Sequence, residues 1–249
     1  PMTVDGPEEL AKLQRIGQIV GLTLKTMSQA VRPGITTAEL DALGLRTLQA
    51  HGARSAPRLV YQFPGATCNS VNEEAAHGIP GPRVIRAGDL VNIDVSAELD
   101  GYFADTGASV AVPPVAEPTQ KLCDAVQTAL WRVIDTLRAG MPLNTVGRIV
   151  EEEARRSGLR PIRVLTGHGV GRSLHEEPEA IHNFFKPNDK RIFHEGQVVA
   201  IEPFMTLGSG NIVEEPDGWT LRTADRRLPA QYEHTLVIQS GPALVITAV

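Results

Sequence analysis

Two aspartates, Asp94 and Asp105, lie in apolar segments on either side of a strong turn signal. Residues 90–98 are rich in Val, Ile and Leu, and Asp100-Gly101 is typical of a two-residue β-hairpin turn. With the turn centred there, Asp94 lies opposite Gly107, and the two aspartates form a diagonal pair on one face, roughly 7–8 Å apart at Cβ or a little less. Facing carboxylates in an apolar setting repel unless a cation or proton intervenes. The pattern favours a metal site, although a longer loop would separate the pair and either Asp could be a solvated edge residue.

A histidine lies in the glycine-rich segment Gly167-His-Gly-Val-Gly171. Taken alone, His168 could be a metal ligand or an ordinary loop residue. The glycines also resemble a phosphate-binding loop, but no Lys-Ser or Lys-Thr follows them, so we reject a nucleotide site.

Two glutamates occupy apolar, strand-like runs: Glu202 lies in residues 198–204 and Glu233 in residues 231–238. An acid in such a run needs a partner. Either one alone could face outward or form an ion pair. Together with Asp94, Asp105 and His168 they make four carboxylates and one imidazole, a set that two divalent cations would neutralise. Oxygen and imidazole ligands suit Mn²⁺, Fe²⁺, Co²⁺ or Zn²⁺, and the sequence therefore predicts a metal-dependent hydrolase.

The composition narrows the class of protein. A chain of 249 residues with 42% hydrophobic composition can bury the core of one large domain or of two tightly joined halves. A net charge of −5 gives no electrostatic footprint for nucleic acid. Cys68 and Cys123 form neither a metal-binding spacing nor a disulfide framework, and no apolar run approaches the ~20 residues that span a bilayer. We expect a cytoplasmic protein that binds neither membrane nor nucleic acid.

Helical spacing of apolar residues predicts four helices in two pairs. The first helix starts near Pro7 and stops at Pro33-Gly34, and the second has a capping box at Thr36 and Glu39 and ends by Gly52. A third helix, carrying apolar residues from 122 to 137, stops at Gly140-Met-Pro142. Its successor would be capped by Asn144 and end by Gly158.

The two helix pairs share one spacing. Gly34 and Gly52 are 18 residues apart, as are Gly140 and Gly158, and a shift of 106 residues maps the first pair of glycines onto the second. This suggests two similar halves, about 7–110 and 117–249, each a helix pair followed by strands. The connector would run from Pro113-Pro114 to Pro118, and the predicted ligands would meet between the halves, where ligand sites are favoured. Coincidence between two helix–turn–helix units is the alternative.

Over nearly all of residues 7–249 the chain resembles the type I methionine aminopeptidases of metallopeptidase family M24. The resemblance rests on seven motifs in the family's order: His77-Gly-Ile-Pro80, Asn92-Ile-Asp-Val95, Gly101 to Asp105-Thr106, Gly167-His-Gly-Val-Gly171, His175-Glu-Glu-Pro178, Ile201-Glu-Pro-Phe204 and Glu233-His-Thr235. It implies an α+β pita-bread fold, with two pseudo-twofold-related helix-helix-strand halves around a curved antiparallel sheet. Residues 1–249 would form one catalytic domain, acting as a monomer.

The resemblance also implies roles for the predicted ligands. Asp94 and Asp105 would bind the first of two divalent ions, Asp105 and Glu233 would bridge both, and His168 and Glu202 would complete the second site. A hydroxide between the two ions would attack the first peptide bond and release the N-terminal methionine.

Three side chains would assist that reaction. Glu202 would move the proton towards the leaving amine. His175 would stabilise the developing oxyanion, and His77 would contact the peptide near the cleaved bond. The resemblance implies that the substrates are nascent polypeptides, which the protein would reach through a transient association with the ribosome.

The resemblance places four residues around the methionine side chain, namely Phe63, Cys68, Trp219 and Val60. An apolar slot with aromatic walls and a sulfur contact suits a thioether. Val60 and Leu174 stand where bacterial relatives often carry aromatic residues, so we expect a wider or differently shaped pocket. Phe63 and Trp219 could instead be core residues, and Cys68 a small buried hydrophobe.

Other members of the fold are weighed by what the chain lacks. Prolyl-directed aminopeptidases and prolidases carry a large domain ahead of this module, and type II methionine aminopeptidases carry an insertion between the positions of His175 and Glu202. Creatinase-like members lack the five ligands that are present here. A prolyl-directed aminopeptidase and a non-catalytic pita-bread module that binds a partner remain the alternatives.

Overall fold

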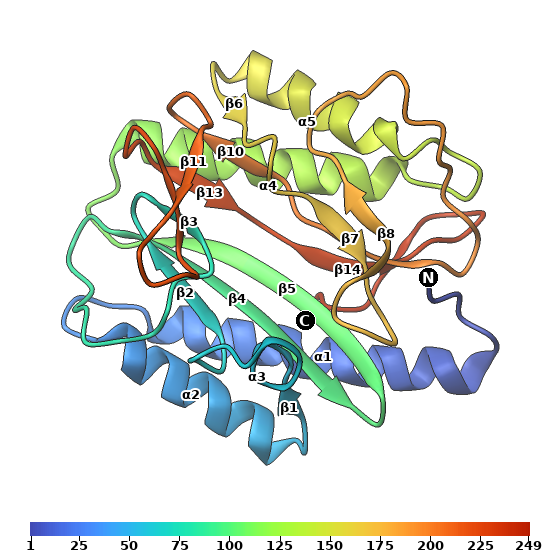
Figure 1. Ribbon diagram of the computed structural model, residues 1–249, viewed down its shortest axis with the longest axis horizontal. Coiled ribbons are helices and arrows are strands. Elements are labelled where there is room, and N and C mark those ends of the chain that lie inside the picture. The colour runs from blue at the N-terminus through green and yellow to red at the C-terminus, as the bar shows by residue number, and fades with distance from the viewer.

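The computed structural model describes residues 1–249 and places two pairs of helices on opposite sides of a central layer of strands (Figure 1). On one side lie α1 (Pro7–Ala30) and α2 (Thr37–Ala50), and on the other α4 (Glu117–Thr136) and α5 (Asn144–Arg156). The short helix α3 (Ala56–Tyr61) follows the first pair. None of these helices is long and apolar enough to span a membrane.

The predicted helix pairs are present, and local chemistry explains the N-termini of three of the four helices. Pro7 stands in the first turn of α1, where the missing N–H costs nothing. The capping box of α2 is formed: Thr36 accepts from the backbone N–H of Glu39, and the Glu39 carboxylate accepts from the backbone N–H of Thr36. Because α4 already begins at Glu117, Pro118 lies in its first turn and the connector is shorter than the sequence suggested.

The predicted cap of α5 is wrong. Asn144 is the first residue inside the helix, and Leu143, with a helical backbone (φ −59°, ψ −35°), precedes it without a side-chain cap. A capping side chain has to leave the helical conformation so that its oxygen can meet the first N–H groups. The Asn144 amide instead donates to the carbonyls of Lys186 and Asp189, at 3.2 and 3.4 Å.

The strands are short except for one long hairpin, and all of their pairings are antiparallel. Their bounds are β1 Arg54–Ser55, β2 Cys68–Val71, β3 Glu74–Ala76, β4 Leu90–Leu99, β5 Tyr102–Ala111, β6 Arg160–Pro161, β7 Gly167–Gly169, β8 Glu176–Ile181, β9 Val198–Ile201, β10 Phe204–Thr206, β11 Ile212–Glu214, β12 Leu221–Thr223, β13 Pro229–Gln231, β14 His234–Val237 and β15 Leu244–Val245. The order β1-β4-β2, with β5 beside β4, forms one sheet, and β15-β14-β9-β7-β8 forms another. Smaller sheets are β13-β10-β6 and β11-β12-β3.

The hairpin of β4 and β5 has the predicted register. The turn is centred on Asp100 and Gly101, both with positive φ (54° and 84°). Asp94 pairs with Gly107 and Asp105 with Ser96, so the two aspartates lie on one face. The two-residue turn thus fixes which side chains of both strands point towards the second half of the chain.

Two large apolar cores fill the space between the helices and the strands. One core packs α1 and α2 against β4 and β5, and the other packs α4 and α5 against β9, β10 and β14. Gly17 of α1 lies against the backbone of Ile246, so closely that a Cβ atom would collide with it. The strand layer is therefore packed against a helix pair on each side.

A buried carboxylate anchors the segment between α3 and β2. Asp41 of α2 accepts hydrogen bonds from the backbone N–H and the hydroxyl of Thr67 (2.7 and 2.6 Å) and from the backbone N–H of Ala66 (3.1 Å). Neither backbone N–H would have this partner without the carboxylate. The interaction fixes the chain just before Cys68 enters the sheet.

Replacing Asp41 by Ala is expected to lower the free energy of unfolding by about 2–4 kcal/mol, because hydrogen bonds to a charged group are lost and buried donors lose their partner. Denaturant unfolding of both proteins would measure the change. Asp135→Ala, at an exposed position of α4, is the control, and its free energy of unfolding should stay within about 0.5 kcal/mol of the wild type. A similar small change for Asp41→Ala would contradict the anchoring role.

Candidate metal centre

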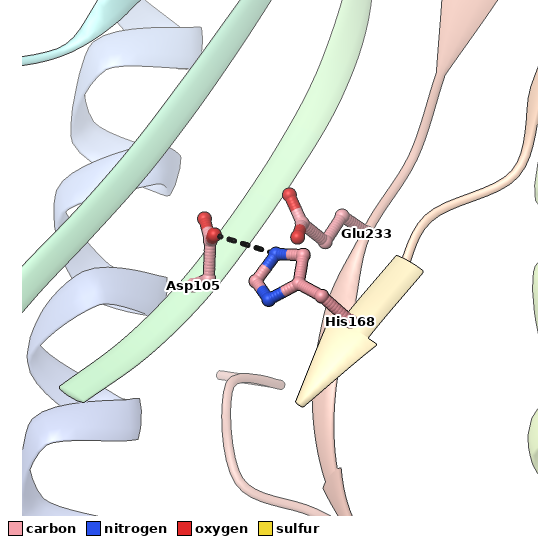
Figure 2. Close-up of side chains that lie close together, drawn as sticks. All are labelled: Asp105, His168 and Glu233. Atoms are coloured by element: carbon pink, nitrogen blue, oxygen red, sulfur yellow. Dashed lines mark ion pairs between the residues drawn. The ribbon is translucent and has the colours of Figure 1, made fainter. Parts of the chain in front are cut away.

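Five ligand-type side chains from five segments of the chain converge at the centre of the strand layer. Ligand atoms of Asp105, His168 and Glu233 lie within 4.8 Å of one another, and so do those of Asp94, Glu202 and Glu233 (Figure 2 shows the first set). Glu233 is common to both sets. His168 Nε2 also lies 3.5 Å from Asp105 Oδ2 and 3.3 Å from Glu202 Oε1. The structure therefore brings together all five residues that the sequence singled out.

Short strands and their ends position these groups. Asp94 and Asp105 lie on the long hairpin, and His168 is the middle residue of β7. The two glutamates do not lie inside strands as the sequence suggested: Glu202 follows the end of β9, and Glu233 lies between β13 and β14. At these breaks a side chain can turn towards the hairpin instead of following the alternation of a regular strand.

Backbone contacts join the hairpin to the second set of strands at this place. Glu233 and Gly107 exchange two backbone hydrogen bonds, of 2.9 and 3.3 Å. The Thr235 hydroxyl accepts from the backbone N–H of Asp105 (3.0 Å) and donates to its carbonyl (2.7 Å). These bonds fix the separation of the ligands on the two sides independently of any bound ion.

The electrostatics of the cluster calls for a cation. Asp105, His168 and Glu233 are each 5% exposed or less, and Asp105 Oδ1, His168 Nε2 and Glu233 Oε1 are buried without a hydrogen bond. Burial and the neighbouring carboxylates raise the pKa of Asp94 and Glu233 well above the usual range. Burial also raises the pKa of Glu202. Such groups stay charged only if positive charge is brought among them.

The imidazole of His168 is oriented for this purpose. Its Nδ1 lies 2.8 Å from the carbonyl of Gly169, which makes Nδ1 the donor and leaves the Nε2 lone pair facing the carboxylates. In the absence of an ion, burial opposes the charged ring, but Asp105 and Glu202 outweigh it and raise the pKa of His168 to about 10. The donor set of carboxylate oxygens and one imidazole fits a divalent metal.

Gln231 is a residue that the sequence argument did not assign. Its side-chain N–H₂ group lies 3.3 Å from Asp94 Oδ2, 3.2 Å from Glu202 Oε2 and 3.1 Å from Glu233 Oε2. The side-chain oxygen of Gln231, Oε1, accepts from the side-chain amide of Asn92 at 2.9 Å, and this bond fixes the orientation of the Gln231 amide. The strand predicted over residues 231–238 could have revealed it, because alternation along that strand would put Gln231 and Glu233 on the same face.

A cavity of about 340 Å³ opens above the cluster. Its lining residues are Pro57, Tyr61, Phe63, Cys68, His77, Asp94, Ser96, Asp105, His168, Leu174, His175, Glu202 and Trp219. The predicted residues His77, His175, Phe63, Cys68, Trp219 and Leu174 are thus brought together with the ligands. His77 has a left-handed backbone (φ 57°), a conformation uncommon outside glycine that often marks functional sites.

Val60 is not brought to the cavity. It lies on the outer face of α3, 42% exposed, and the next residue, Tyr61, lines the cavity instead. Successive residues of a helix point about 100° apart, so a motif alignment that is right for the segment can still choose the wrong face. The Tyr61 hydroxyl lies 2.6 Å from His175 Nδ1, and nothing in the sequence signalled that contact.

The remaining wall of the cavity is apolar. Phe63 and Trp219 pack edge to face with ring centroids 5.2 Å apart, and Cys68 and Leu174 are buried beside them. Phe63 is also buried, whereas Trp219 is half-buried at the rim. An apolar slot that adjoins a metal-type cluster can hold a side chain while the backbone next to it reaches the ligands.

Comparisons with known proteins point to one family. The sequence matches the model of metallopeptidase family M24 over residues 11–240. It is 45% identical over 247 residues to methionine aminopeptidase 2 of Bacillus subtilis, covering 99% of each chain. The crystal structure of methionine aminopeptidase from Thermotoga maritima is similar with a TM-score of 0.95 and 31% identity, covering 100% of both chains. Prolidase from Pyrococcus furiosus has a TM-score of 0.78 and 21% identity, and the similarity covers 99% of this chain and 66% of that one.

Removing the Gln231 side chain is expected to weaken metal binding. Gln231→Ala should lower the affinity for Mn²⁺ or Co²⁺ about 10- to 100-fold, the usual effect of losing a group that orients metal ligands. Competition with a chelator would measure the affinities. Gln18→Ala, on the exposed face of α1, is the matched control and should bind like the wild type. Equal affinity in Gln231→Ala would show that the amide does not organise the carboxylates.

Proposed function

This chain belongs to metallopeptidase family M24, and we propose from that membership and from the site that it is a metal-dependent methionine aminopeptidase, which hydrolyses the peptide bond after an N-terminal methionine. The predicted α+β pita-bread fold is confirmed, since the whole chain superposes on a solved enzyme of that fold. The predicted class of protein, a metallo-exopeptidase, is confirmed by the same relatives.

The observation that supports this function most directly is the position of the ligand cluster at the floor of an apolar cavity. A substrate side chain packed against Phe63, Cys68 and Trp219 would bring its own α-amino group and first carbonyl next to the carboxylates. The cavity volume of about 340 Å³ accommodates one side chain and the adjoining peptide unit. This arrangement suits removal of a single N-terminal residue.

We propose that the cluster holds two divalent ions. Asp94, Asp105, His168, Glu202 and Glu233 would be the ligands, and the support is that two sets of three ligand atoms share Glu233. Co²⁺, Mn²⁺, Fe²⁺ and Zn²⁺ all suit this donor set. When bound, a divalent metal acts as a Lewis acid that lowers the pKa of water towards neutrality and polarises a carbonyl.

The protein's own groups would then handle protons and orientation. Glu202, which is 9% exposed and opens on the cavity, is placed to accept a proton from the attacking water and to pass it to the leaving amine. His175 lines the cavity beside His168, with ring centroids 4.1 Å apart, and would donate a hydrogen bond to the substrate carbonyl as negative charge develops there. His77 lies on the same rim and would contact the peptide next to the cleaved bond.

The pocket would select methionine through shape and polarity. Phe63 and Trp219 supply aromatic walls, and the sulfur of Cys68 and the aliphatic Leu174 complete an apolar surface against which a thioether packs without losing hydrogen bonds. With Leu174 in the wall and Val60 outside it, the width of the slot depends on Leu174 and Tyr61.

On the family resemblance alone, we extend the proposal to nascent polypeptides as substrates. A monomeric enzyme in the cytoplasm would bind them during a transient association with the ribosome. We also propose that residues 7–110 and 117–249 are related halves of one domain. The helix pairs on opposite sides of the strands support this, as does the division of the ligands, two on the hairpin of the first half and three in the second.

A peptide-cleavage assay tests the function. The protein is stripped of metal, Mn²⁺ or Co²⁺ is restored, and release of the first residue is compared for Met-Ala-Ser, Leu-Ala-Ser and Ala-Pro-Ala. We expect metal-dependent release of methionine from the first peptide alone. Asp94→Asn and Glu202→Gln should reduce turnover by at least about 10²-fold while keeping the wild-type fold, because one removes a ligand charge and the other a proton acceptor.

The other outcomes assign the chain differently. Cleavage of Ala-Pro-Ala alone would favour a prolyl-directed peptidase, and a folded, metal-loaded protein that cleaves none of the three would favour a binding module. Turnover at the wild-type rate in Asp94→Asn would contradict the metal chemistry.

His175 gives a second prediction, because it lies beside the ligands without being one. His175→Ala should lower kcat by about 10²-fold, the cost of losing an oxyanion donor, and leave the bound metal unchanged. Steady-state kinetics and metal analysis of the same preparation would measure both. Parallel losses of activity and of metal would mean that His175 serves the metal site instead.

A further inference from the structure

Tyr61 contacts His175, one of the residues of the proposed active site. Its hydroxyl lies 2.6 Å from His175 Nδ1, and the two rings are tilted by 50° with centroids 5.6 Å apart. This is the one hydrogen bond that either side chain makes to another group of the protein. At 2.6 Å it is shorter than most bonds between a hydroxyl and a ring nitrogen.

The position of Tyr61 is set by its backbone. Tyr61 is the last residue of α3, and the next residue, Gln62, ends the helix in a left-handed conformation (φ 57°). The Gln62 and Phe63 N–H groups bond back to the carbonyls of Arg58 and Pro57. At the N-terminus of the helix, the hydroxyl of the N-cap residue Ser55 donates to the carbonyl of Ala66 at 2.6 Å. The phenol is thus carried by a tightly closed turn.

His175, in contrast, needs an external partner to fix its ring. It lies in the turn between β7 and β8 and is exposed to the cavity. Rotation about the bond to an imidazole ring has two broad minima, which exchange the position of Nδ1 with that of Cδ2 and the position of Nε2 with that of Cε1. The His168 ring, tilted by 46° with its centroid 4.1 Å away, makes no hydrogen bond to His175 that would choose between these two orientations. The hydroxyl of Tyr61 distinguishes them, because it engages Nδ1 and leaves Nε2 free to face the cavity.

We propose that Tyr61 is a positioning residue for His175: its phenol donates a hydrogen bond to Nδ1, holds the ring in one orientation and keeps the ring proton on Nε2, where it faces the substrate carbonyl. A phenol remains protonated near neutral pH and is a ready donor. Burial and the charge of Asp105 raise the pKa of Tyr61 further, so the hydroxyl keeps its proton. A neutral imidazole that accepts at one nitrogen must donate at the other.

The role in catalysis rests on the proposed function, since the carbonyl in question belongs to the substrate. The ring orientation and tautomer do not, because the contact joins two side chains of the protein and involves no substrate atom. The two claims can therefore be tested separately.

The first test is spectroscopic and uses metal-free protein. Nitrogen-15 chemical shifts of the histidine rings are measured at mildly alkaline pH in the wild type and in Tyr61→Phe, and His175→Gln identifies the His175 signals by their absence. We expect the proton on Nε2 in the wild type and a mixture of tautomers in Tyr61→Phe, which lacks only the hydroxyl. A proton on Nδ1 in the wild type, or an unchanged pattern in Tyr61→Phe, would overturn the proposal.

The second test is kinetic and uses the metal-loaded enzyme with Met-Ala-Ser. Tyr61→Phe should lower kcat about tenfold and change KM by less than about twofold, because the ring donor is disordered while the pocket remains. In a His175→Ala background the same substitution should have no further effect. Leu59→Ala, also on α3 and 44% exposed outside the cavity, is the control and should match the wild type.

The two tests separate the possible failures. If the wild type releases methionine and Tyr61→Phe changes neither kcat nor the tautomer, the positioning role is wrong and the proposed function stands. If the wild type releases no methionine, the proposed function fails, and the spectra alone decide whether Tyr61 orients His175. An equal loss of activity in the His175→Ala background would also overturn the role, since Tyr61 would then act independently of His175. Unchanged metal content and melting temperature in Tyr61→Phe would exclude a general loss of structure.

Discussion

The mutual repulsion of four carboxylates in one buried cluster is the constraint on which the rest of the structure depends. Burial and the neighbouring carboxylates raise the pKa of Asp94 and Glu233, and buried polar atoms of Asp105, His168 and Glu233 have no hydrogen-bond partner. The fold nonetheless keeps them together, because Glu233 and Gly107 share backbone hydrogen bonds and Thr235 holds both backbone groups of Asp105. The electrostatic repulsion within the cluster is thus offset by the hydrogen bonds between the β4–β5 hairpin and residues 233–235 and by the two apolar cores.

The site consists of the proposed metal ligands, most of them buried, and of a more exposed rim of residues around the cavity. The ligands lie on strands or directly at their ends, in a layer that helices cover on both sides (Figure 1). His77 and His175 belong to connecting segments around the cavity, and Tyr61 ends a short helix. This division suits a metallopeptidase, because metal ligands tolerate little movement while the rim has to admit a peptide.

Local chemistry made the positions of the ligands predictable, but it predicted the residues of the rim only in part. Asp100-Gly101 specifies its own turn, and that turn alone determines that Asp94 and Asp105 share a face. The capping box of α2 is similarly self-contained. Val60 and Tyr61 differ in role because of the rotation of one short helix, which depends on contacts distant in the sequence. Asn144 is not a cap because Leu143 before it already has a helical backbone, and the Asn144 amide bonds to Lys186 and Asp189, which are distant in the sequence.

Gly107 constrains the proposed metal site although it has no side chain. A methyl group at this position would lie 2.5 Å from Gln231 Oε1 and 3.0 Å from its Nε2. The amide would have to move, and with it the donor shared by Asp94, Glu202 and Glu233. Steric room at Gly107 is therefore part of the chemistry of the site. Gly107 is not a ligand. An alanine at this position would nevertheless disturb the Gln231 amide, which contacts three of the proposed ligands.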